Sequence, residues 1–219
     1  MQTKEINISA GTLELTGNLN IPEGANSLVI FSHGSGSSRF SARNNHVAKL
    51  LNKEKIATLL IDLLTGIEDT VFENRFNIEL LSERLIEVTL YVQQLEEVRD
   101  LTIGYFGAST GAASALKAAA YLDKTIKAIV SRGGRPDLAK SSLKSVKAPT
   151  LLIVGSLDKE VIKLNDEAYS LLNCERKIEI VKGASHLFEE PGKLDEVAVL
   201  ATNWFKKYSN NFKITTHVV

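Results

Sequence analysis

The chain begins with apolar and polar residues that alternate on both sides of Gly11. The stretch KEINISAGTLELTGNLNIP has the two-residue period of strands with one face toward water and one toward a core. We therefore expect an antiparallel hairpin at the start of the chain, with its turn at Gly11.

A series of short, nearly continuous apolar runs follows this segment. Such runs are typical of strands that are buried on both faces, as in a parallel sheet covered by helices. Their sequences are SLVIFSH, IATLLID, LTIGYFG, IKAIVSRG, PTLLIVGS and RKIEIVKG.

Two further segments carry apolar residues three or four positions apart, which gives one apolar stripe on a helix. The first stripe comprises Ile78, Leu81, Leu85, Val88, Val92 and Leu95, and the second comprises Val197, Leu200, Ala201, Trp204 and Tyr208. Strands that alternate with helices predict an α/β fold with a doubly wound, mostly parallel sheet, helices on both faces and an N-terminal antiparallel hairpin. We expect one domain over residues 1–219. Residues 209–219 show no clear pattern, although FKITTHVV also suits an edge strand.

Composition narrows the class of protein. The 26 Lys and Arg residues balance the 26 Asp and Glu residues, so charge suggests neither a nucleic-acid partner nor a membrane surface. The polar start and the shortness of the apolar runs indicate a soluble, cytoplasmic protein. Cys174 is the only cysteine, which excludes an internal disulfide and a cysteine-rich zinc site. We expect no metal and no cofactor, and the sequence leaves homo-oligomerisation open.

In an open parallel sheet, ligands bind at the carboxyl ends of the strands. The informative residues are therefore those that directly follow the apolar runs. These are His33 to Ser38, Asp62, Ser109, Arg132 to Asp137, Ser156 to Asp158 and Gly183 to His186.

Ser109 lies between an apolar run and an alanine-rich segment, in the sequence GASTG. A strand that turns directly into a helix strains the residue at the turn and raises its side chain above the sheet. Gly107 and Gly111 leave room for the helix to approach the strand. This G-x-S-x-G pattern is weak alone, but with a strand before it and a helix after it, it predicts a nucleophile.

A serine hydroxyl needs a base to remove its proton. His186 follows the last strong apolar run and is the favoured base. His33 is expected to support its own loop by hydrogen bonding, His46 to lie on a helix in a surface role, and His217 to lie in the tail with no role.

The imidazole in turn needs a carboxylate that fixes its tautomer. Asp158 follows the preceding apolar run, so its loop should neighbour that of His186. We favour Asp158 over Asp137. The alternative role for Asp158 is to cap the helix that starts near Lys159.

Acyl transfer also needs hydrogen-bond donors for the developing oxyanion. The expected donors are the backbone N–H of Thr110, directly after the nucleophile, and that of Ser35 in the glycine-containing loop FSHGSGSS. The glycines of these loops do not complete a phosphate-binding pattern, because Arg39 and Ala112 stand where a glycine would be required.

Taken together, the chain resembles the α/β-hydrolase superfamily and, within it, the small dienelactone-hydrolase-like esterases. The resemblance rests on HGSGSS (33–38), GASTG (107–111), GSLD (155–158) and GASH (183–186), spread over about residues 27–208. It implies a serine hydrolase that forms an acyl-enzyme, with Ser109, Asp158 and His186 as the catalytic triad. Dienelactone hydrolases use cysteine as nucleophile, and this chain has Ser109 there, which puts dienelactone itself in doubt as the substrate.

Substrate choice is less determined by the sequence. The gap between Ser131 and Pro149 is too short for the cap domain that many family members insert there. Residues 63–77 form the longest non-periodic loop at the active edge and are a candidate partial lid. Gly36, Arg39, Arg132 and Arg135 are candidate substrate-binding residues, with Arg43 also near. The alternative for these arginines is structural pairing with Asp137, Asp62 or Glu73.

The predicted function is hydrolysis of carboxylic esters or thioesters of small molecules. Two alternatives stay open. One is an acyltransferase or perhydrolase that uses the same triad, and the other is a non-catalytic ligand-binding protein that retains the fold.

Overall fold

The alternating N-terminal segment forms the expected hairpin. Strand β1 (Gln2–Ala10) pairs antiparallel with β2 (Leu13–Ile21), and Gly11 occupies the turn with a φ of 61°. The computed structural model describes residues 2–209, and the segment FKITTHVV lies outside the described residues.

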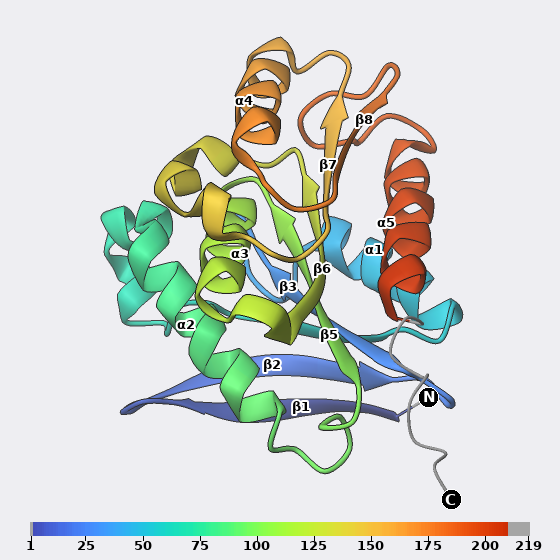
Figure 1. The fold of residues 1–219 in the computed structure, drawn as a ribbon. Coiled ribbons are helices and arrows are strands. Elements are labelled where there is room, and N and C mark those ends of the chain that lie inside the picture. Colours follow the sequence, from blue (N-terminus) through green and yellow to red (C-terminus); the bar gives the residue numbers. More distant parts are fainter. Residues whose placement is uncertain (1, 210–219) are drawn as a thin grey trace, which may run out of the picture.

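Each apolar run forms a strand of one eight-stranded sheet with the order β1-β2-β4-β3-β5-β6-β7-β8 (Figure 1). The strands β3 to β8 pair in parallel, and β2 joins them antiparallel through β4. The strands are β3 (Ser27–Ser32), β4 (Ala57–Ile61), β5 (Thr102–Ala108), β6 (Ile126–Arg132), β7 (Thr150–Gly155) and β8 (Arg176–Val181).

The prediction that the strands are buried on both faces is confirmed for the central strands but is wrong for β8. Every residue of β3, β4 and β7 is buried, whereas Ile180 of β8 is 44% exposed. The reason is position: β8 is the edge strand, and it pairs only with β7. Its charged residues Lys177 and Glu179 alternate with isoleucines, which is the pattern of a half-covered edge strand.

Helices cover both faces of the sheet (Figure 1). On one face, α1 (Ala42–Lys53) and α5 (Lys193–Ser209) pack over a core that includes Phe31, Phe106 and Trp204. On the other, α2 (Ile78–Val92), α3 (Thr110–Tyr121) and α4 (Lys159–Leu171) cover a second core. Both expected apolar stripes face these cores, except that α2 ends before Leu95.

Short 3-10 helices fill the remaining connections. The chain between β6 and β7 contains only η4 (Pro136–Ser145), so this fold has no large cap domain. The segment after β4 contains η1 (Glu68–Thr70) and η2 (Phe72–Phe76), and η3 (Asp123–Thr125) precedes β6. The carboxyl ends of the central strands therefore stay free of an inserted domain.

Candidate active site

Ser109 stands at the sharp turn between the end of β5 and the first residue of α3. Its backbone has φ 51° and ψ −121°, a conformation that a residue with a side chain adopts rarely. Such strain persists only where the surroundings enforce it, and it is common at functional sites. The turn is the strand–helix context that the sequence predicts for a nucleophile.

The two glycines around Ser109 allow this turn. A Cβ on Gly107 would lie 2.5 Å from the Cα of Ala112, inside α3. A Cβ on Gly111 would lie 2.2 Å from the carbonyl oxygen of Ser32, at the end of β3. Both contacts are with backbone, which cannot rotate away, so the helix reaches its place only because these positions lack side chains.

Backbone hydrogen bonds hold Ser109 from the neighbouring β6 loop. The N–H of Ser109 donates to the carbonyl of Arg132 at 3.2 Å. The N–H of Arg135 donates to the carbonyl of Ser109 at 3.0 Å. The strained residue is therefore held on both sides of its Cα, by the last residue of β6 and by the loop that follows it.

Asp158 and His186 form a direct hydrogen bond, with His186 Nδ1 2.6 Å from Asp158 Oδ2. A carboxylate can only accept, so Nδ1 carries a proton, and in the neutral imidazole Nε2 then keeps a free lone pair. Asp158 occupies the cap position of α4 but makes no side-chain bond to that helix. The rival acid Asp137 instead binds Arg135, with Oδ2 2.8 Å from Arg135 Nη2.

The loops that carry the acid and the base are joined by further hydrogen bonds. The N–H of Leu157 donates to the carbonyl of Ala184 at 3.0 Å, and the N–H of Gly183 donates to Ser156 Oγ at 2.8 Å. A Cβ on Gly155 would lie 2.3 Å from the Ala184 carbonyl oxygen. The two loops therefore form one tightly packed unit.

Ser109 and His186 line the same cavity, which has a volume of about 230 Å³. Its other lining residues are Gly34, Ser35, Ser37, Ser41, Arg43, Asn44, Ala108, Arg132 and Leu187. Within the described chain, no direct hydrogen bond joins Ser109 Oγ to His186, which is common before substrate binds. Two larger hollows, of about 320 and 340 Å³, lie away from this edge and contain neither residue.

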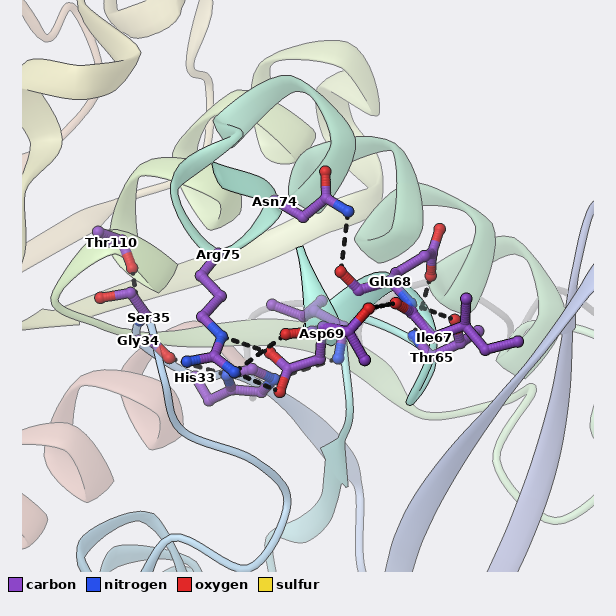
Figure 2. Close-up of polar contacts among 12 residues, drawn as sticks. His33, Gly34, Ser35, Thr65, Ile67, Glu68, Asp69, Asn74, Arg75 and Thr110 are labelled. Carbon is purple, nitrogen blue, oxygen red and sulfur yellow. Dashed lines mark hydrogen bonds and ion pairs between the residues drawn. The ribbon is translucent and has the colours of Figure 1, made fainter. Parts of the chain in front are cut away.

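Of the two expected oxyanion donors, Ser35 lines the cavity, and Thr110 lies beside Ser35 (Figure 2). The N–H of Ser35 donates to Thr110 Oγ1 at 2.8 Å, so a side-chain hydroxyl occupies this donor in the free protein. Thr110 is the first residue of α3, and its own N–H therefore has no acceptor within the helix. Sequence reasoning did not foresee the hydroxyl contact, since it depends on the side-chain rotamer of Thr110.

His33 supports the Ser35 loop, as expected (Figure 2). Its Nε2 accepts from the N–H of Leu63 at 3.1 Å, so Nδ1 carries the proton and donates to the Gly34 carbonyl at 2.9 Å. Burial lowers the pKa of His33 below its ordinary value. A neutral imidazole with both nitrogens occupied is a structural link between this loop and the end of β4.

The candidate lid does not close the cavity. No residue of 63–77 is among its lining residues. The segment is instead held by its own side chains: Arg75 Nε donates to Asp69 Oδ1 at 2.8 Å, and Asn74 Nδ2 donates to the Glu68 carbonyl at 2.8 Å (Figure 2). Phe72 is 63% exposed.

The candidate substrate-binding residues fall into two groups. Arg39 binds Asp62, with its N–H 2.7 Å from Asp62 Oδ1, and Arg135 binds Asp137. Gly36 has a φ of 67°, and a Cβ at this position would meet no atom within 4 Å. None of these three lines the cavity. Arg132 does, beside two residues of α1, Arg43 and Asn44, of which Asn44 carries no sequence signal for a site.

Within residues 2–209, the remaining ionisable residues suggest no second centre. His46 lies on α1, as expected, and its exposed ring binds Asp195 of α5 at 2.6 Å. His217 lies outside the described residues. Across residues 2–209, no group of three His, Cys, Asp or Glu side chains is arranged to hold a metal ion. The helices of that same range include none with the length and apolarity to cross a membrane.

No family model matches the chain. Among solved structures, dienelactone hydrolase from Anabaena variabilis is 50% identical, with a TM-score of 0.92 over 94% of this chain and 98% of that chain. Est1E from Butyrivibrio proteoclasticus is 17% identical, with a TM-score of 0.79 over 93% of this chain and 98% of that chain, and is similar in fold alone.

A curated protein from Mycobacterium tuberculosis, named "Putative phosphoribosyl transferase", is 50% identical over 205 residues. The match covers 94% of this chain but only 46% of that protein. The chain thus spans about half the length of the curated relatives it matches.

Proposed function

The chain belongs to the dienelactone-hydrolase-like family of α/β-hydrolases, and we propose on that basis that it is a serine hydrolase that cleaves carboxylic esters or thioesters of small molecules. The observation that carries the proposal is the 2.6 Å hydrogen bond between Asp158 and His186. It leaves His186 Nε2 as a proton acceptor in the cavity where Ser109 stands on its strained turn.

In the proposed reaction, Ser109 Oγ attacks the ester carbonyl carbon while His186 Nε2 takes the hydroxyl proton. The carbonyl π bond breaks to give an oxyanion, which the N–H groups of Thr110 and Ser35 stabilise. For Ser35, the oxyanion replaces Thr110 Oγ1 as the acceptor. The carbonyl re-forms, and the leaving alcohol or thiol departs with the proton from His186. Water repeats the sequence on the acyl-enzyme and releases the acid.

Asp158 keeps its carboxylate charge throughout and stabilises the imidazolium that forms. Each oxyanion donor is typically worth about 2.7–4 kcal/mol of barrier. The loops that carry these groups come from four different strand ends, and their hydrogen bonds to one another fix the geometry before substrate arrives.

The transferase name of the mycobacterial relative applies to a protein of about twice this length. We assign that name's chemistry to the part of the relative that this chain does not match. The glycine loops at this sheet edge surround a serine and a histidine, which suits acyl transfer.

Ester turnover tests the proposal. Wild-type protein should release p-nitrophenol from p-nitrophenyl acetate with a burst followed by steady turnover, and Ser109→Ala should show neither while remaining folded. Ser170→Ala is the matched control, because Ser170 is exposed on α4 and bonds only its own helix. No turnover by wild type of any oxygen or thiol ester would overturn the proposal and favour a ligand-binding role.

The acyl acceptor is tested in the same assay. A hydrolase should form free acid in water alone. Added methanol should only compete with water for the acyl-enzyme and in that way raise the rate of p-nitrophenol release. Acid formation that requires no second alcohol supports hydrolysis. Turnover that occurs only when an alcohol or hydrogen peroxide is added would show that an acyltransferase or perhydrolase is the better description.

A further inference from the structure

One of the two expected oxyanion donors is already occupied by a side chain of the protein. The N–H of Ser35 donates to Thr110 Oγ1 at 2.8 Å, which joins the loop after β3 to the first residue of α3 (Figure 2). Thr110 is only 5% exposed, so little water reaches this contact. The other expected donor, the N–H of Thr110 itself, has no acceptor within its helix. The two donors are therefore unequal before a substrate arrives.

The loop that carries Ser35 is fixed beside the expected nucleophile. The carbonyl of Gly34 accepts from the N–H of Ser37 at 3.2 Å, which closes a tight turn around Ser35. A Cβ on Gly34 would lie 3.2 Å from the Cβ of Ser109, so the loop backbone packs directly against the strained turn. The Thr110 hydroxyl, in contrast, can leave the Ser35 N–H by a rotation about one side-chain bond. The side chain, and not the loop, is therefore the part that yields.

Any ligand oxygen that reaches the Ser35 N–H must compete with this hydroxyl. An ester carbonyl and a hydroxyl are both neutral acceptors, so the ester gains little when it replaces the hydroxyl. An oxyanion accepts a charge-assisted hydrogen bond, which is about twice as strong, and can displace the hydroxyl. The ester and the transition state each forgo one neutral hydrogen bond to the competitor. Loss of equal binding in both states raises KM and leaves kcat unchanged.

We propose that the Thr110 hydroxyl is an internal competitor in the oxyanion hole, an autoinhibitory contact that keeps ester binding weak without slowing the chemical step. The inference rests on the proposed function and adds to it a role for the Thr110 side chain, because the proposed reaction uses only the backbone N–H of this residue. The contact also favours release of the acid product. As a carboxylate oxygen leaves the hole, the hydroxyl returns to the Ser35 N–H.

Replacement of Thr110 by Val tests the competition, because valine has nearly the same shape but no acceptor. For p-nitrophenyl butyrate, Thr110→Val should lower KM by about two- to tenfold, the value of a neutral hydrogen bond, with kcat within about twofold. Inhibition by the product butyrate should tighten by a similar factor. An unchanged KM, or a fall in kcat, would overturn the inference, because the hydroxyl would then be idle or would support the hole.

Further variants separate competition from support of the fold. Thr110→Ser keeps the acceptor and should keep the wild-type KM, whereas Thr110→Ala removes it and should behave like Thr110→Val. Thr12→Val, at the exposed turn of the β1–β2 hairpin, is the matched control and should change neither constant. A lower KM in Thr110→Ser or in Thr12→Val would contradict the assignment to this hydroxyl.

Direct binding keeps the test independent of turnover. Calorimetry with p-nitrophenyl butyrate compares Ser109→Ala with a double variant that also carries Thr110→Val. The double variant should bind the ester about two- to tenfold more tightly. Equal or weaker binding by the double variant would overturn the inference, whereas tighter binding without any ester turnover by wild-type protein would contradict the proposed function alone.

Discussion

Asp158 occupies the cap position of α4, yet its carboxylate turns away from that helix and accepts a hydrogen bond from His186 Nδ1. A helix cap normally uses its side chain to satisfy a free N–H of the first turn. Here the side chain of the cap residue is used to orient an imidazole from a neighbouring strand end.

Replacement of Asp158 by Asn should therefore disable catalysis more than it affects stability. An Asn amide can donate to Nδ1, which moves the imidazole proton to Nε2 and removes the base. In a serine protease triad the same change lowers kcat by about 10⁴. Asp137→Asn is the matched control, because Asp137 binds Arg135 and not His186. If Asp137→Asn is the variant that loses ester turnover, the acid is wrongly assigned.

Gly111→Ala should damage the turn at Ser109. The new Cβ would lie 2.2 and 2.4 Å from the carbonyl oxygens of Ser32 and His33, so either α3 or the end of β3 must move. Overpacking of this kind typically costs about 1–3 kcal/mol. Urea unfolding and ester turnover should both show the loss. Gly66→Ala places its Cβ in open space and should change neither, and equal behaviour of the two variants would refute this account of the turn.

Acid should weaken the fold partly through His33. Burial lowers the pKa of His33 in the folded protein, so the unfolded chain takes up a proton first as the pH falls. The unfolding free energy should thus be retained above the unfolded imidazole value of about 6.5 and decline below it, by at most about 1.4 kcal/mol per pH unit for this group. His33→Gln, which does not titrate, should be less stable at pH 7 but decline less steeply. Parallel declines in urea unfolding between pH 7 and 5 would exclude this role.

Short acyl chains should be the best substrates. The cavity is small, no cap domain is present, and residues 63–77 do not line it. Without apolar walls, the gain of about 0.8 kcal/mol per buried methylene is not available. In a series of p-nitrophenyl esters, kcat/KM should be highest from acetyl to butyryl. A steady rise to decanoyl that disappears in Phe72→Ser and Phe76→Ser would show that η2 closes over the site.

Much of this architecture could be predicted from local pattern. Each buried strand is a run of apolar residues, and Gly107 and Gly111 mark the Ser109 turn because only small residues fit there. The position of a strand within the sheet is harder to predict. RKIEIVKG contains apolar residues like the central strands, and only the strand order shows that β8 lies at the edge, with β7 as its single neighbour.

The charges at the site could not be assigned from sequence alone. Arg39, Arg132 and Arg135 look equivalent along the chain, since each lies at or after the end of an apolar run. The fold brings acidic partners to Arg39 and Arg135 and leaves Arg132 buried beside Arg43. The pairing of Arg39 with Asp62 depends on side chains that are distant in sequence, as does the contact between Ser35 and Thr110.

The most direct test of the central claim is to map the residue that a fluorophosphonate modifies. The account predicts one adduct per chain in wild-type protein, located by peptide mass spectrometry on Ser109, and none in a folded Ser109→Ala variant. Ser170→Ala should be modified like wild type. Modification of another residue, or equal modification of Ser109→Ala, would contradict Ser109 as the nucleophile.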